Sequence, residues 1–105
     1  YSLKKRICFD ISHTFMACNY YKIDFYESIE KLLSVTAHIH ISDALGSDGE
    51  GLQLDEGEIC FKSVCNILNK AKSNISIIPE IWQGHKQSGR AFKIALEALQ
   101  KYGLQ

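Results

Sequence analysis

Three short runs rich in β-branched residues, each followed by a segment of helical periodicity, constrain the fold of this 105-residue chain more than any other feature. We predict strands over residues 6–11, 37–42 and 75–81, and the regular part of the last should end at Pro79, because proline cannot donate a ladder hydrogen bond. Strands that alternate with amphipathic helices are typical of a parallel sheet with right-handed crossovers. The sequence therefore predicts an α/β fold of three consecutive βα units whose strands end at one common edge.

The segments between and after these strands carry helix signals. Asp24, with Glu27 in the capping-box position, predicts the start of one helix, and apolar periodicity predicts another over about 61–72. Ser88 is the expected N-cap of the last helix and Gly103 its stop. Each apolar stripe is expected to face the sheet.

Two segments give no regular signal. Residues 14–23 are rich in aromatic side chains, and we expect an irregular connection there. Residues 43–58 combine glycines with acidic side chains. A connection that long inside a compact domain is usually functional or disordered, and a solvated surface loop is the plain alternative.

The run His38-Ile-His-Ile-Ser-Asp43 carries polar chemistry on one face. Side chains alternate along a strand, so its two histidines share one side and its isoleucines the other. By the same alternation Asp10 and Glu80 fall at the ends of the other two strands, beside His40 and opposite the aliphatic rows. Two carboxylates and an imidazole form a set of donors suited to Mn²⁺, Co²⁺, Zn²⁺ or Fe²⁺. Read alone, the run could equally be an ordinary half-exposed strand.

Four further residues are candidates for contact with a substrate. His13 lies just beyond the first strand, and His38 lies one strand repeat before the central histidine. Trp82 could stack on the carbon skeleton of a sugar or simply pack against the last helix, and His85 is a loop histidine near the start of that helix.

Composition excludes several functional classes. The 12 basic and 12 acidic residues balance and form no basic run, which argues against nucleic acid and anionic membranes as partners. No apolar run approaches membrane-spanning length. The four cysteines show no Cys-x-x-Cys spacing, so we expect free thiols in a reducing cytosol and a cytoplasmic protein.

Four motifs in order carry a family resemblance. They are Asp10-Ile-Ser-His13, the run from His38 to Asp43, Leu54-Asp-Glu-Gly-Glu-Ile-Cys-Phe61, and Pro79-Glu80. Over about residues 7–103 the chain resembles the last three βα units of the xylose-isomerase-like TIM barrels, the sugar phosphate isomerase/epimerase or AP endonuclease 2 family.

The resemblance implies a site and a reaction. Asp10, His40 and Glu80 would be the metal ligands, and His13 and His38 would line the substrate pocket. The metal would be Mn²⁺, Co²⁺, Zn²⁺ or Mg²⁺, and the reaction would be isomerisation or epimerisation of a sugar or sugar phosphate by proton abstraction next to a carbonyl. Glu80 and His13 would be the catalytic residues.

The sequence departs from the family pattern at several positions, and these departures bear on which branch of the family the chain resembles. An endonuclease-type phosphodiesterase is disfavoured, because Glu50-Gly-Leu-Gln stands where that branch carries Asp-Arg-His. Asp55 replaces the usual glycine and Cys60 the usual helix-capping acid, so we expect a different local turn.

The chain is shorter than a complete barrel of this family. An eight-unit barrel typically needs about 250 residues. We therefore expect residues 1–105 to be a single domain that forms the C-terminal fragment of a TIM barrel, inactive alone, and either self-associating or joined to the missing N-terminal part. A non-catalytic sugar- or partner-binding module fused to another enzyme is the alternative, and a purely structural remnant is a third reading.

Overall fold

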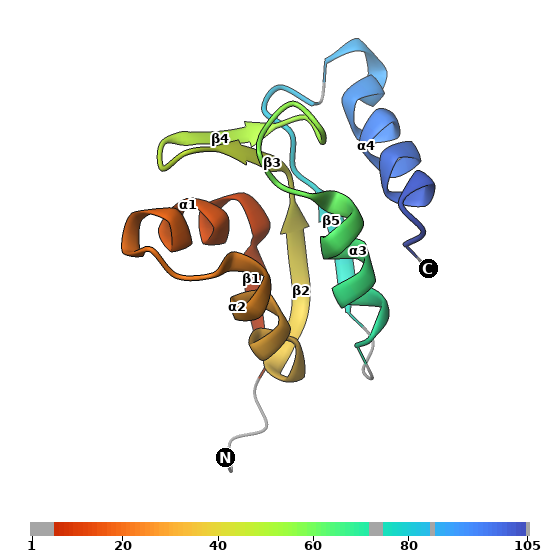
Figure 1. Ribbon diagram of the computed structural model, residues 1–105. Coiled ribbons are helices and arrows are strands. Elements are labelled where there is room, and N and C mark those ends of the chain that lie inside the picture. The colour runs from red at the N-terminus through yellow and green to blue at the C-terminus, as the bar shows by residue number, and fades with distance from the viewer. Residues whose placement is uncertain (1–5, 72–74, 85, 105) are drawn as a thin grey trace.

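A three-stranded parallel sheet lies at the centre of the computed structural model, which describes residues 6–71, 75–84 and 86–104. Its strand order is β1-β2-β5, formed by β1 (Ile7–Asp10), β2 (Thr36–Ile41) and β5 (Ser76–Pro79). Figure 1 shows the strands running in one direction. The predicted α/β fold with parallel strands is confirmed, and the third strand ends at Pro79 as expected.

Helices cover one face of this sheet and lie beside it (Figure 1). Among the described residues, none of them is both long enough and apolar enough to cross a membrane. The helices are α1 (Ile11–Tyr21), α2 (Phe25–Leu32), α3 (Phe61–Asn69) and α4 (Arg90–Lys101), with 3-10 turns η1 (Leu33–Val35) and η2 (Gln87–Gly89).

Helix α1 corrects the expectation of an irregular connection over residues 14–23. It begins directly after β1, where the Asp10 side chain accepts a hydrogen bond from the backbone N–H of His13 at 2.9 Å. Ile11 and Phe15 are buried one turn apart on its inner side. Aromatic, Thr and Asn residues have modest helix propensity, so α1 depends on tertiary packing that a propensity reading does not detect.

The acidic segment over residues 43–58 is neither disordered nor a plain solvated loop. It contains an antiparallel hairpin of β3 (Asp43–Leu45) and β4 (Gly49–Leu52), which packs against α1. The fully buried carboxylate of Asp43 orders the return of the chain to α3 by accepting four backbone N–H bonds. The donors are Ala44 at 2.8 Å, Asp55 and Gly57 at 2.9 Å, and Ile59 at 3.0 Å.

Gly57 is required by this close approach. A Cβ atom at this position would lie 2.3 Å from the carbonyl oxygen of Ala44 and 2.6 Å from Oδ1 of Asp43. Those separations are far below van der Waals contact, so any side chain would push the segment off the carboxylate.

The starts of two helices differ in how well the sequence predicts them. Asp24 caps α2 as expected, accepting from the backbone N–H of Glu27 at 2.9 Å. Ser88 is not the N-cap of α4, because it lies within η2 and the helix begins after Gly89, whose φ of 76° suits a residue without a side chain. Gly103, with φ of 84°, follows the last turn of α4 as predicted.

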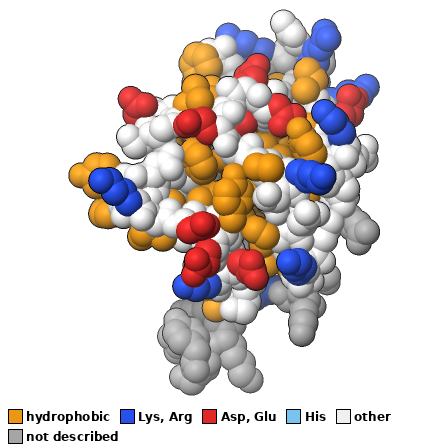
Figure 2. All heavy atoms as spheres, in the orientation of Figure 1, with side chains coloured by type: hydrophobic (Ala, Val, Ile, Leu, Met, Phe, Trp, Pro, Cys, Tyr) orange, Lys and Arg blue, Asp and Glu red, His pale blue; other side chains and the backbone are white. Residues whose placement is uncertain are grey.

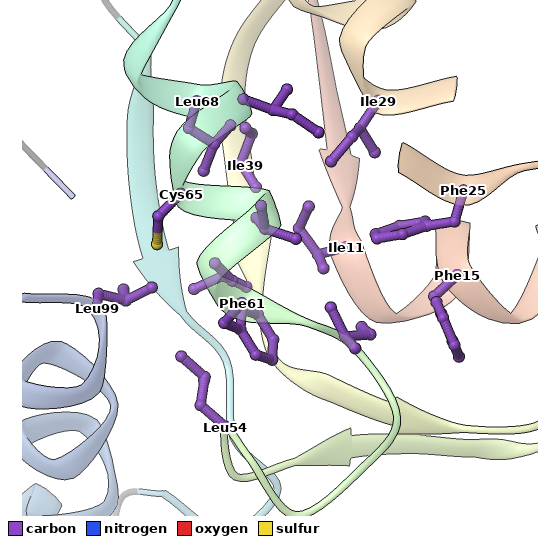
Figure 3. Packing of buried hydrophobic residues seen from close by; sticks show 14 of the residues in the cluster. Ile11, Phe15, Phe25, Ile29, Ile39, Leu54, Phe61, Cys65, Leu68 and Leu99 are labelled. Carbon is purple, nitrogen blue, oxygen red and sulfur yellow. The ribbon is translucent and has the colours of Figure 1, made fainter. Parts of the chain in front are cut away.

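The core lies between the helices and the sheet. Figure 3 shows Ile39 of β2 facing Phe61 and Leu68 of α3, with Ile29 of α2 nearby. On the helix-covered side, hydrophobic side chains reach the surface in a band across the middle, with charged side chains around it, and no histidine is visible there (Figure 2). The histidines of β2 point to the opposite face, as the alternation along the strand predicts.

Candidate functional site

The triad predicted from the sequence meets at the carboxyl edge of the sheet. The parallel register pairs Asp10 with His40, and Glu80 directly follows the last residue of β5. One possible ligand atom of each residue lies within 4.8 Å of those of the other two. Strand order and side-chain alternation thus bring two carboxylates and an imidazole to one point.

Asp10 is fixed by the same contacts that start α1. The hydroxyl of Ser12 donates to Oδ1 at 2.8 Å, and the backbone N–H of His13 donates to the same oxygen at 2.9 Å. The described contacts of Asp10 engage Oδ1, so Oδ2 is the oxygen it can offer to a cation. Ser12 is 2% exposed, which makes it a rigid support for the carboxylate.

His40 and Glu80 are aimed at each other. His40 Nδ1 lies 2.6 Å from Oε2 of Glu80, and their side chains are 34% and 57% exposed. The two ligand atoms of this pair thus point to the same place, where both could bind one cation.

Glu50 is a site residue that the sequence reading missed. His13 Nε2 pairs with Oε2 of Glu50, which lies on β4, and this hydrogen bond is the main cause of a raised pKa for His13. The charges of Asp10 and Glu80 also raise that pKa, while partial burial opposes them. Glu50 is 37 positions from His13 in the sequence, and several other acidic residues lie in the same segment. The pairing therefore becomes visible only when the hairpin is seen to bring β4 beside the start of α1.

An open hollow of about 270 Å³ joins these groups. Trp82 lies on its wall and is 76% exposed, so it is not packed away against α4, and its backbone N–H donates to the carbonyl of Gly51 at 2.9 Å. The residues around the hollow are Asp10, Ser12, His13, Ser42, Glu50, Gly51, Glu80, Ile81 and Trp82.

The sequence predicts two further residues to contact a substrate, His38 and His85. His38 is not among the described residues that line the hollow, and its ring instead stands edge-on to His40, with the centroids 4.9 Å apart. His85 lies outside the described residues. Asp43, which the sequence puts at the end of the histidine-bearing run, is turned into the hairpin and orders the backbone there.

The donor set fits a divalent cation. Two carboxylate oxygens and one imidazole nitrogen suit Mn²⁺, Co²⁺ or Zn²⁺, and three protein ligands leave positions open for water or substrate. The hollow beside Asp10 and Glu80 provides the space for such ligands.

Comparison with known proteins identifies the family. A search of curated proteins finds no match to the chain. The family model described as xylose isomerase-like TIM barrel matches residues 4–102, nearly the whole sequence. The chain therefore belongs to the xylose isomerase-like TIM barrel family.

Proposed function

We propose that this chain supplies part of the active site of a sugar or sugar phosphate isomerase or epimerase that depends on a divalent cation. The observation that carries the proposal is the meeting of Asp10, His40 and Glu80 within 4.8 Å at the ends of three neighbouring parallel strands. The carboxyl edge of such strands is where barrel enzymes build their active sites.

Asp10, His40 and Glu80 would hold the cation, which is Mn²⁺, Co²⁺, Zn²⁺ or Mg²⁺ in this proposal. A bound cation would withdraw electron density from the carbonyl and hydroxyl oxygens of an open-chain sugar, which acidifies the intervening C–H bond. Ser12 keeps the Asp10 carboxylate in position through its 2.8 Å hydrogen bond.

The reaction needs groups that move protons. Isomerisation moves one proton from the carbon next to the carbonyl to the carbonyl carbon and a second from the hydroxyl oxygen to the carbonyl oxygen. Epimerisation removes a proton from one carbon and returns a proton to the opposite face of the same carbon; neither reaction requires an oxidant. The exposed carboxylate of Glu80 is our candidate base. His13, whose pKa is raised by Glu50, holds a proton at higher pH than an ordinary histidine and can donate it to a substrate oxygen.

Cation titration and turnover test the proposal together. With the purified full-length protein, calorimetry should show one Mn²⁺ per chain at this site, and Asp10→Asn or Glu80→Gln should weaken binding at least about tenfold. Aldose–ketose interconversion and epimerisation should fall in parallel. Asp48→Asn, at the exposed hairpin turn, is the matched control. Full activity after replacement of Asp10, His40 and Glu80 in turn would overturn the proposal.

The exposed Trp82 beside an open hollow favours a second candidate, a non-catalytic sugar-binding module. An uncovered indole face can stack on the C–H groups of a sugar ring without any reaction. Cation and sugar binding without turnover, with sugar binding lost in Trp82→Ala, would favour this module over the enzyme.

A further inference from the structure

A second group of metal-binding side chains lies on the same face of the sheet. Cys8, His38 and His40 each offer a ligand atom within 4.8 Å of the other two. Cys8 is exposed and both histidines are half-buried in the described chain. Cys8 and His38 lie two residues before Asp10 and His40 on their strands. We call the set of Asp10, His40 and Glu80 the rim.

The strand register produces this group. β1 and β2 run in parallel with Cys8 opposite His38 and Asp10 opposite His40. Neighbouring strands lie about 4.8 Å apart, and residues two positions apart share a face. The sulfur of β1 therefore stands beside two imidazoles of β2, whose rings meet edge to face at 4.9 Å.

The chemistry of this group differs from that of the rim. One thiolate and two imidazoles are softer donors than two carboxylates and one imidazole, so they select Zn²⁺ or Co²⁺ over Mn²⁺ and Mg²⁺. Three such ligands leave one position of a tetrahedral shell open. The other cysteines stand apart, since Cys18 and Cys65 are buried and Cys60 lies at the start of α3.

We propose that Cys8, His38 and His40 form a second cation site, one that binds a thiophilic divalent ion such as Zn²⁺ or Co²⁺. His40 belongs to both sets of ligands, and its Nδ1 is directed at Glu80. A cation at the second site engages the imidazole on which the rim also depends, so Zn²⁺ weakens the binding of Mn²⁺ at the rim.

Cobalt spectroscopy tests the site directly. Addition of one equivalent of Co²⁺ to the purified full-length protein should produce a near-ultraviolet sulfur-to-cobalt charge-transfer band, and Zn²⁺ should abolish it. Cys8→Ser should remove the band and His38→Ala should weaken it. Cys60→Ser should leave it intact, which controls for the other exposed thiol. Circular dichroism verifies that each variant is folded.

The outcomes separate this site from the proposed function. Asp10→Asn should weaken Mn²⁺ binding and keep the cobalt band, whereas Cys8→Ser should keep Mn²⁺ binding and lose the band. Absence of the band in the unaltered protein, or its persistence in Cys8→Ser, would overturn the second site. Failure of Mn²⁺ binding with the band present would overturn the rim site alone.

Discussion

His13 and Glu50 form a charged contact that joins the end of β1 to the hairpin. Both side chains are more than half exposed, so the contact adds little to stability, and its effect falls on the proton affinity of His13. Because the pKa of His13 is raised in the folded state, its small stabilising effect is complete below the ordinary pKa of about 6.5 and disappears as the pH rises through the folded value.

Glu50→Gln should lower the pKa of His13 toward the ordinary value, because the charged hydrogen-bond acceptor is lost. Titration of the His13 ring signal by NMR measures this shift. Glu56→Gln, which removes an exposed acid elsewhere in the same segment, is the control and should leave the titration unchanged. An unaltered His13 titration in Glu50→Gln would contradict the pairing.

Asp43 is the residue on which the acidic segment depends. Asp43→Asn should lower the free energy of unfolding by about 2 kcal/mol, because an amide NH₂ would face N–H donors and leave some of them without an acceptor. Urea unfolding measures the change, and Asp48→Asn at the hairpin turn should have no comparable effect. Equal stability of the two variants would show that the four hydrogen bonds are replaced by water.

Among the elements, α3 starts without a side-chain cap. Cys60 occupies the N-cap position with extended backbone angles and makes no capping hydrogen bond. Its thiol instead accepts a hydrogen bond from the Ser63 hydroxyl at 3.4 Å, which is the main cause of a lowered Cys60 pKa. Cys60 thus leaves the first turn of α3 without an oxygen cap.

Cys60→Asp should stabilise the protein by about 1 kcal/mol, because a carboxylate at this position can accept from the first-turn N–H groups. Thermal unfolding checks the change. Cys60→Ala, which has no acceptor, should give no such gain. A Cys60→Asp variant no more stable than Cys60→Ala would mean that the backbone of Cys60 does not present the side chain to the helix.

The elements also show which parts of the structure the sequence predicts. The three strands follow from short apolar periods, and the rim follows from them because alternation fixes which side chains share a face. Helix α1 is not predicted from the sequence, because residues of modest helix propensity obscure its apolar spacing. The hairpin segment is not predicted either. It is held in place by one buried carboxylate, Asp43, which accepts hydrogen bonds from backbone groups up to 16 positions away, and such contacts leave no periodic pattern in the sequence.

For the whole molecule, the sheet is incomplete by the standard of its family. β1 and β5 each have a neighbour on one side only among the described strands, and a barrel closes eight strands into a ring. Ile78, beside His40 on the face away from the helices, is 53% exposed. This face and these edges are surfaces that further strands would cover.

The 105-residue chain produced alone should therefore self-associate and bind a dye that reports exposed apolar surface. Light scattering over a range of concentrations measures the association. Co-expression with a segment that supplies further barrel strands should reduce both signals. A monomer at high concentration with no dye binding would contradict the expectation that this sheet needs a partner.

The two oxygens of Asp10 differ in their contacts: Oδ1 starts α1, and Oδ2 is the oxygen that would face the cation of the proposed function. A relative that no longer bound a cation would still be under selection to keep an aspartate here, because its loss would remove the N-cap hydrogen bond of α1. Retention of Asp10 is therefore a poor marker of activity when relatives are compared. His40 and Glu80, which cap no helix in the described structure, are the positions whose replacement would identify an inactive descendant.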